Sequence, residues 1–323
     1  MPLRLALFIA LTAAIVSGAT PSPALLVLDK DDAALVIIDP ATGKIAGRVP
    51  TGAGPHEVAA SADGKLAFVG NYGGNPGNTV SVIDLVAQKE LHRFEITPLS
   101  RAHGVAFFDG KFYFTAEANK VIGRYDPAAN VIDWVLGTGQ NTTHMVLLSK
   151  DGSKIFTANI GSDSVSIFER SGAANWNQTV VAVGKGPEGI DLSPDGREIW
   201  TAHSRDGGVS IIDVGGKKVV QTLNLGTGRS NRLKFTPDGR RVLISDINAG
   251  EVLVLDAPAR KEIKRLKVGK TPEGILVAPD GSHAYLAVTG DNQIAVLDLK
   301  TLEITGHIEP GKGPDGMAWA ERK

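Results

Sequence analysis

Short runs of alternating apolar and polar residues repeat along this chain at nearly constant spacing. Between residues 187 and 228 the runs read GIDLS, EIWTA, GVSIID and KVVQTLNL, and each is rich in β-branched residues. Runs of this length and composition are typical of β-strands. After residue 24 no long stretch shows the 3.6-residue period of a helix, so the pattern predicts an all-β protein.

Two series of turn residues give the period of the repeat. Asp-Gly pairs follow the first run of each unit at spacings of 46, 42, 44, 43 and 42 residues. The pairs are Asp63-Gly64, Asp109-Gly110, Asp151-Gly152, Asp195-Gly196, Asp238-Gly239 and Asp280-Gly281. Acidic residues close the third run of each unit, at Asp39, Asp84, Asp126, Glu169, Asp213, Asp256 and Asp298. A period of about 40–45 residues with four strands per unit predicts a β-propeller of seven blades, each of four antiparallel strands.

The last unit is divided between the two ends of the chain. Residues 315–320 match a first strand, whereas residues 24–50 supply three further strands. We therefore expect N- and C-terminal strands to close the last blade together, which removes an open sheet edge. Residues 20–323 are then a single propeller domain.

The residues at equivalent positions of the repeats show a family resemblance. Residues 68–71 read FVGN before TVSVID at 79–84, and residues 156–159 read FTAN before SVSIF at 164–168. These motifs resemble the signature of the YVTN family of β-propellers, a group that includes YncE-like and lactonase-like propellers. The segment VGKTPEG at 268–274 resembles the connector of that family. Related propellers include binding proteins, lactonases and metal- or haem-dependent enzymes, so the resemblance implies the fold and leaves the activity open.

The N-terminus predicts export. In residues 1–19, Arg4 precedes the apolar stretch Leu5–Val16 and the small residues Ser17, Gly18 and Ala19, as in a secretory signal peptide. The apolar stretch is short for a membrane span, so we expect no stable span after cleavage and a periplasmic or secreted protein. A retained N-terminal anchor is the alternative. The chain has no Cys, which excludes disulfides and thiolate metal ligands.

Charge argues against nucleic acid as a partner. The formal net charge is −1, and no block of Lys or Arg is longer than two residues. Nucleic-acid binding by a broad electrostatic surface needs a basic patch. The sequence identifies no protein partner.

Two columns of the repeat are expected to form rings at one mouth of the central channel. The first column stands where the chain enters each innermost strand, at His56, His103, His144, Glu188, Asn231, Glu273 and Asp315. The second column stands at the end of each second strand, at Asp29, Asn71, Glu117, Asn159, His203, Asp246 and Thr289. Equivalent positions in successive blades surround one axis, so these side chains should lie close together.

Histidines on three consecutive innermost strands predict a metal site. His56, His103 and His144 could converge, and Glu117 or His203 could complete or orient the set. Neutral imidazole binds divalent transition metals, here zinc, copper or iron. The alternative is that these residues are polar lining of a wet channel mouth, bonded to loops and water.

A small ligand is expected at the same mouth. Arg101 and Arg232 flank ring positions and could hold an anionic group by charge. The polar ring residues expected to contact this ligand are Asn71, Asn159, Asn231, Asp246 and Asp315.

The sequence therefore favours an exported propeller that binds a small ligand, with or without a metal, at a mouth lined by His and Glu. One alternative is a metal-dependent enzyme, either lactonase- or lyase-like or redox. In it a metal would polarise a carbonyl, and Glu117, Glu188 or Glu273 would act as general base. The other alternative is a protein-interaction platform with an inert channel.

Overall fold

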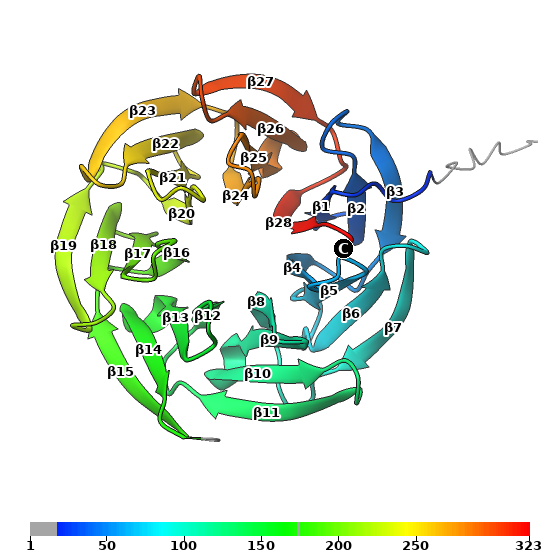
Figure 1. The fold of residues 1–323 in the computed structure, drawn as a ribbon, viewed down its shortest axis with the longest axis horizontal. Coiled ribbons are helices and arrows are strands. Elements are labelled where there is room, and N and C mark those ends of the chain that lie inside the picture. The colour runs from blue at the N-terminus through cyan, green and yellow to red at the C-terminus, as the bar shows by residue number, and fades with distance from the viewer. Residues whose placement is uncertain (1–17, 173–174) are drawn as a thin grey trace, which may run out of the picture.

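Seven four-stranded antiparallel sheets surround a central axis in the computed structural model, which describes residues 18–172 and 175–323 (Figure 1). The predicted all-β propeller of seven blades is confirmed. The expected signal peptide, residues 1–19, lies almost wholly outside the described residues. Across the described ranges, no helix combines the length and the apolar character that a membrane crossing requires.

Strands run outward from the axis in chain order in blades 1 to 6, whereas in blade 7 the C-terminal strand lies innermost and is followed by the first three strands of the chain. The innermost strands of blades 1 to 7 are β4 (Pro55–Ala60), β8 (Ala102–Phe108), β12 (Thr143–Leu148), β16 (Pro187–Leu192), β20 (Ser230–Phe235), β24 (Pro272–Val277) and β28 (Pro314–Ala320). The second strands are β5 (Leu66–Asn71), β9 (Lys111–Ala116), β13 (Lys154–Asn159), β17 (Glu198–His203), β21 (Arg241–Asp246), β25 (His283–Val288) and β1 (Ala24–Asp29).

The outer half of each blade follows the same order. The third strands are β6 (Thr79–Asp84), β10 (Val121–Asp126), β14 (Ser164–Arg170), β18 (Gly208–Asp213), β22 (Glu251–Asp256), β26 (Gln293–Asp298) and β2 (Ala34–Ile38). The outermost strands are β7 (Lys89–Glu95), β11 (Val131–Gly137), β15 (Trp176–Ala182), β19 (Lys218–Asn224), β23 (Lys261–Lys267), β27 (Glu303–Ile308) and β3 (Ile45–Pro50). Three short 3₁₀ turns follow second strands, at η1 (Glu117–Asn119), η2 (Ile160–Ser162) and η3 (Thr289–Asp291).

Each Asp-Gly pair forms the tight turn between a first and a second strand. In blade 4, the Asp195 carboxylate accepts hydrogen bonds from the Ser193 hydroxyl at 2.6 Å and from the Arg197 N–H at 3.0 Å. Gly196 has a φ of 75°, a conformation that glycine adopts without steric cost. These turns place all the inner-strand exits on the face opposite the expected mouth.

Blade 7 contains the first and the last strand of the described residues. Strand β28 pairs antiparallel with β1, and the register sets Trp319 opposite Leu25 and Ala318 opposite Leu26. The predicted closure of the last blade by N- and C-terminal strands is thereby confirmed. Arg48 on β3 reinforces this blade, because its guanidinium donates to the buried Asp29 carboxylate at 2.8 Å.

The hydrophobic core lies between neighbouring blades. One buried cluster joins Leu26 and Leu35 of blade 7 to Val58 and Val69 of blade 1. Other clusters repeat this arrangement around the ring, as where Trp200 of blade 4 packs in one cluster with residues of blade 5. Burial of apolar side chains between blades, at about 25 cal/mol per Å², stabilises the closed ring.

Every innermost strand has a β-bulge at the same point. The pairing register passes over His56, His144 and Glu188, and it shifts at the corresponding residues of the other four blades. A bulged residue leaves the ladder, and its side chain is re-aimed. Each bulge falls on a residue of the first predicted column.

Candidate functional site

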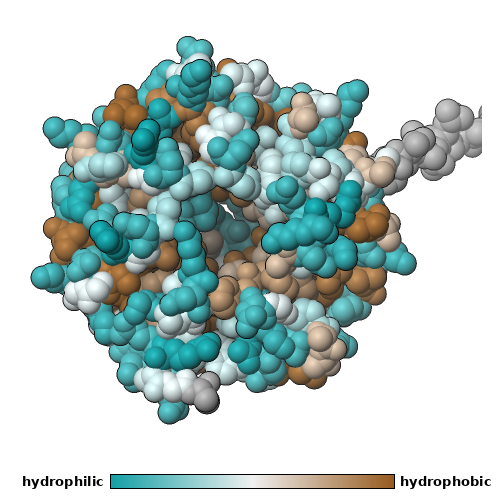
Figure 2. Space-filling model, in the orientation of Figure 1, coloured by the Kyte–Doolittle hydropathy of each residue, from teal (hydrophilic) through white to brown (hydrophobic). Residues whose placement is uncertain are grey.

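The first column of residues surrounds one cavity in the central channel. Seven side chains, one from each innermost strand, line a cavity of about 180 Å³ together with Lys30, Tyr72, Arg229 and Arg232. The seven are His56, His103, His144, Glu188, Asn231, Glu273 and Asp315. Viewed down its shortest axis, the molecule has an opening at the centre of the ring (Figure 2).

The second column mostly lies away from this cavity, which differs from the sequence expectation. Five of its residues pair in register with the residue just before a bulge, namely Asp29, Asn71, Asn159, His203 and Asp246. In blades 2 and 6 that register position belongs to Ala116 and Val288. Glu117 and Thr289 therefore stand one residue further along the chain, and they contact first-column residues.

Side chains of the displaced residues hold the connectors between strands. Asn71 accepts a hydrogen bond from the Gly52 N–H at 3.0 Å. The Asp246 carboxylate accepts from the N–H groups of Gly228 and Arg229 at 2.7 and 3.0 Å. The Asn159 amide donates to hydroxyls in its own blade. These polar groups are buried and bonded within the blades.

In blades 7 and 1, the residue that follows the second column reaches the mouth. Lys30 follows Asp29, Tyr72 follows Asn71, and both line the cavity. Consecutive residues in an extended strand face opposite sides of the sheet. If the repeats are aligned one residue out of place, a residue that bonds within its blade is therefore taken for one that faces the cavity. If Lys30 and Tyr72 had been aligned with Glu117 and Thr289, the sequence would have indicated Lys30 and Tyr72 as cavity residues.

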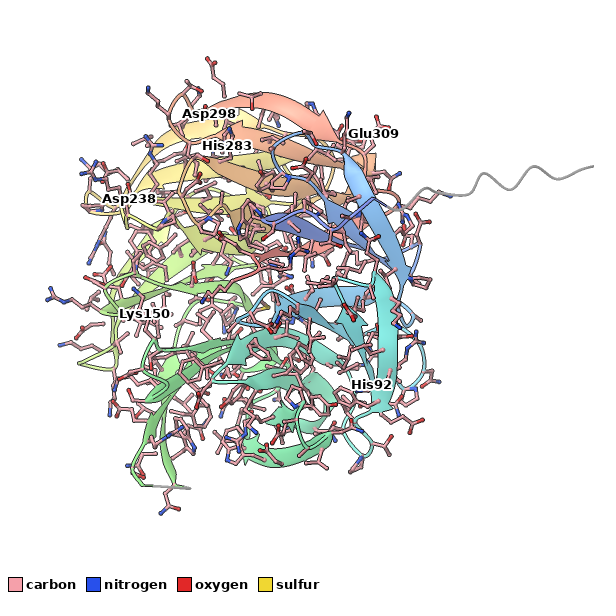
Figure 3. The ribbon with its side chains drawn as sticks, turned by 45° about the vertical axis from the view of Figure 1, so that its right-hand side comes forward. His92, Lys150, Asp238, His283, Asp298 and Glu309 are labelled. Carbon is pink, nitrogen blue, oxygen red and sulfur yellow. The ribbon has the colours of Figure 1, made fainter. Side chains whose placement is uncertain are left out.

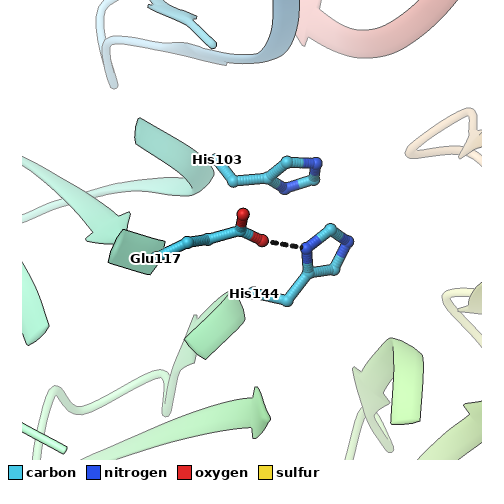
Figure 4. Close-up of side chains that lie close together, drawn as sticks. All are labelled: His103, Glu117 and His144. Atoms are coloured by element: carbon cyan, nitrogen blue, oxygen red, sulfur yellow. Dashed lines mark hydrogen bonds and ion pairs between the residues drawn. The ribbon is translucent and has the colours of Figure 1, made fainter. Parts of the chain in front are cut away.

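His103, Glu117 and His144 form a compact group of metal-binding character (Figure 4). One donor atom from each residue lies within 4.8 Å of the others, and all three residues are buried. His144 Nδ1 and Glu117 Oε1 are 2.5 Å apart, and the two imidazole rings have centroids 3.7 Å apart. The Tyr72 hydroxyl donates to the other oxygen of Glu117 at 2.7 Å. Two imidazoles and a carboxylate are donors that suit zinc, copper or iron.

Two nitrogen atoms of this group are left without partners. His103 Nδ1 and His144 Nε2 are buried, and neither has a hydrogen-bond partner among the described residues. Burial, and after it electrostatic repulsion from the neighbouring His144 and Arg232 side chains, holds the pKa of His103 well below its ordinary value. His103 is therefore neutral near pH 7, the form in which imidazole binds a metal.

The other two candidate histidines lie outside the group. His56 lines the cavity, its ring centroid is 5.4 Å from that of His103, and its Nδ1 is 3.0 Å from the Gly54 carbonyl oxygen. His203 is fully buried at the end of β17, and its Nδ1 is 2.8 Å from the Asp206 carboxylate. Burial lowers the pKa of His203, although Asp206 opposes that shift.

Carboxylates dominate the wall opposite the imidazoles. The Lys30 ammonium lies 2.5 Å from Glu273 and 3.3 Å from Asp315. Burial disfavours the charge on Lys30, but the Asp315 and Glu273 carboxylates outweigh it and raise the pKa of the ammonium. Glu188 accepts a hydrogen bond from the Asn231 amide at 2.5 Å. This wall is a network of bonded acidic groups, with one lysine already bound to it.

Arg232 forms a buried ion pair with Glu57 across the channel. Arg232 on β20 of blade 5 donates to Glu57 on β4 of blade 1, and the residues are 6% and 9% exposed. Burial raises the pKa of Glu57, and the Arg232 charge only partly opposes this rise. Although burial disfavours a charged guanidinium, the Glu57 and Asp315 carboxylates raise the pKa of Arg232 further. Arg232 is therefore already neutralised by a protein carboxylate.

Arg101 differs from Arg232 in its exposure. Its side chain is exposed, and its guanidinium carbon lies 5.1 Å from the centroid of the Tyr72 ring. Such cation–π contacts orient an arginine without neutralising it. Of the two arginines that the sequence indicates, Arg101 is the one still able to meet a ligand.

Comparison with known proteins agrees with this architecture. A family model described as YNCE-like beta-propeller matches residues 110–283. Hydrazine synthase of Kuenenia stuttgartiensis is similar in structure, with a TM-score of 0.76 at 18% identity over 90% of this chain and 99% of that chain. The periplasmic gluconolactonase PpgL of Pseudomonas aeruginosa has a TM-score of 0.76 at 16% identity over 94% of this chain and 100% of that chain.

A third similar structure is the dihydro-heme d1 dehydrogenase NirN in complex with DHE. It has a TM-score of 0.67 at 17% identity over 93% of this chain and 76% of that chain. Identities this low establish a shared propeller fold and nothing finer. No curated protein matches the sequence.

Proposed function

The chain belongs to the YNCE-like β-propeller family, and from this premise we propose that it is an exported protein that binds a divalent transition metal and a small ligand at the mouth of its channel. The leader-like N-terminus supports export, as does the likeness to a gluconolactonase described as periplasmic. His103 and His144 supply imidazole nitrogens to the metal, and Glu117 supplies a carboxylate oxygen.

Two buried, unpartnered imidazole nitrogens carry this proposal. A buried polar atom that lacks a partner costs about 1–3 kcal/mol. His103 Nδ1 and His144 Nε2 both lack one within the described part of the chain, and the other ring nitrogen of His144, Nδ1, is held by the Glu117 carboxylate. A metal ion would satisfy such nitrogens, and Tyr72 would hold Glu117 in place through its hydroxyl.

Metal binding can be tested directly on the purified full chain. We expect stoichiometric metal in protein isolated from its native compartment, and binding of Zn²⁺ or Co²⁺ by calorimetry after chelator treatment. His103→Ala and His144→Ala should each lose at least about tenfold in affinity. Matched controls are His92→Ala and His307→Ala, because these residues lie on the outermost strands β7 and β27. His92, labelled in Figure 3, lies 3.0 Å from the Tyr125 hydroxyl at the periphery of the ring.

The outcome that contradicts metal binding is equally clear. If the wild-type chain binds neither ion, or if both mouth variants retain wild-type affinity, the imidazoles are polar lining. If Glu188→Ala and Glu273→Ala also leave ligand binding unchanged, the protein-interaction platform would be favoured instead.

A second candidate function is a metal-dependent enzyme at the same mouth. Its support is that one cavity joins His103 and His144 to the acidic Glu188 and Glu273, within a fold shared with a gluconolactonase and a dehydrogenase. Glu188 is the stronger general-base candidate, because Glu273 is paired closely with the Lys30 ammonium, whereas Glu188 accepts from the neutral Asn231 amide and lies 3.8 Å from Arg229. Lactone hydrolysis that disappears in Glu188→Gln while metal binding persists would favour the enzyme over the binding protein.

The anionic ligand suggested by the sequence would meet Arg101, as first expected, and Arg229 in place of Arg232. Arg101 and Arg229 are exposed at the mouth, whereas Arg232 is held by Glu57. Binding that weakens in Arg101→Gln and with rising salt would support an anion, since exposed charges are screened by salt.

A further inference from the structure

Two oxygen atoms on the acidic wall of the cavity lack partners. Asn231 Oδ1 and Asp315 Oδ1 are buried, and within residues 18–172 and 175–323 nothing donates a hydrogen bond to either. Asn231 is 5% exposed and Asp315 is 3% exposed, and both line the cavity. Such atoms are costly to bury unless something donates to them.

Their surroundings show that both atoms are acceptors. The Asn231 Nδ2 group donates to the Glu188 carboxylate at 2.5 Å, which assigns the amide orientation and leaves Oδ1 as the free acceptor. The other oxygen of Asp315 faces the Lys30 ammonium at 3.3 Å. A ligand that satisfies this wall must therefore bring hydrogen-bond donors.

The charge of the wall favours a cationic donor. With Arg232 and Glu57 counted as a neutral pair, the carboxylates of Glu188, Glu273 and Asp315 outnumber the cations of Lys30 and Arg229. Arg229 is 3.8 Å from Glu188 and half-exposed, so it neutralises that carboxylate weakly. Lys30 demonstrates the chemistry, because its own ammonium already lies between Glu273 and Asp315.

We propose that Asn231, Asp315 and Glu188 form a subsite for the ammonium group of a small primary amine. An ammonium has three donors and no acceptor, which matches a wall that offers two unpartnered acceptor oxygens. The cavity of about 180 Å³ limits the ligand to a few heavy atoms beyond the ammonium. This inference rests on the proposed function in placing the ligand in the metal cavity, and it gives that ligand a cationic end facing away from the imidazoles.

The test uses chelator-treated full chain, so that it does not depend on metal. Propylammonium is the probe, with propanol as a neutral match in size and propionate as an anion, in saturation-transfer NMR at millimolar concentration. We expect stronger saturation transfer to propylammonium than to propanol or propionate. Asp315→Asn should weaken it by about tenfold, the value of one charge-assisted hydrogen bond. Asp191→Asn is the matched control, because Asp191 lies on an innermost strand but is absent from this cavity's lining.

Asn231→Leu gives a second reading if Asp315→Asn folds poorly, because it removes the free oxygen and keeps the volume. Thermal melts establish that each variant is folded. Equal binding of propanol, unchanged affinity in both mouth variants, or no transfer to propylammonium would each overturn the amine subsite. Amine binding in a chain that takes up no metal would refute the metal proposal alone, and metal uptake without amine binding would refute only the subsite.

Discussion

Replacing Arg232 by Met should destabilise the whole propeller, although Arg232 is one residue in a channel. Its guanidinium connects blade 5 to blade 1 by donating to Glu57. Methionine keeps most of the apolar stem and removes the charge, so packing changes little. What remains is the Glu57 carboxylate, buried without its counter-ion.

The magnitude follows from the burial of the two partners. Arg232 and Glu57 are 6% and 9% exposed, so water cannot replace the missing guanidinium. Removing one partner of a buried ion pair costs about 3–5 kcal/mol. Burial already raises the pKa of Glu57 above that of the unfolded chain, and loss of Arg232 would raise it further. Glu57 then binds a proton more readily when folded, so the loss is largest near neutral pH and shrinks as pH falls through the folded pKa.

Guanidinium unfolding of wild type and Arg232→Met at several pH values measures this effect. The double variant Arg232→Met with Glu57→Met should recover most of the stability, because no buried charge is left unpaired. Arg197→Met is the surface control, since Arg197 is 84% exposed beside Asp195 and should change the free energy of unfolding by under about 1 kcal/mol. An Arg232→Met chain with wild-type stability, or with a loss that does not vary with pH, would refute the role assigned to the pair.

Three further predictions concern other parts of the ring. Deleting residues 315–323 removes nearly all of β28 from blade 7 and should cause aggregation or loss of the cooperative melt, visible by size-exclusion chromatography and calorimetry; an unchanged melt would exclude the shared blade. Burial raises the pKa of Asp29 to about 6 from 3.8, so its contribution to stability is complete below about pH 4 and lost as pH rises through about 6. Relative to Asp29→Asn, wild type should therefore gain up to about 3 kcal/mol on acidification across that window in urea unfolding, and parallel pH curves would contradict this. Tyr72→Phe removes the hydroxyl that donates to Glu117 and should weaken Zn²⁺ binding by about tenfold in calorimetry, whereas equal affinity would leave Tyr72 a packing residue.

The fold could be predicted from the sequence because the turn residues and the period of the repeat indicate the number of blades and the strands in each blade. Asp-Gly turns at regular spacing mark where each first strand ends, and both ends of the chain fit one blade. The first column also depends only on this period. Its position just inside each innermost strand is the same in all seven blades, so alignment of the repeats found the first-column residues that line the cavity.

The rest of the site depends on features that the period does not contain. In five blades the residue of the second column pairs with the residue just before the bulge and lies away from the cavity. In blades 2 and 6 that register position is Ala116 or Val288, so the polar residue stands one position further along. The ion pair between Glu57 and Arg232 could not be predicted from the sequence for another reason. These residues are 175 positions apart, on blades that are not neighbours, and no spacing rule indicates which side chains span a channel.

Because of the bulge on each innermost strand, the side chain at the mouth can change with little effect on the stability of its blade. The first-column residue at each bulge takes no part in the pairing ladder, and its blade is held by the rest of the ladder and by the apolar clusters further out. Histidine, glutamate, asparagine and aspartate can therefore occupy equivalent places in different blades of one ring. Selection can rewrite such a mouth one blade at a time, keeping the scaffold while it changes what the protein recognises.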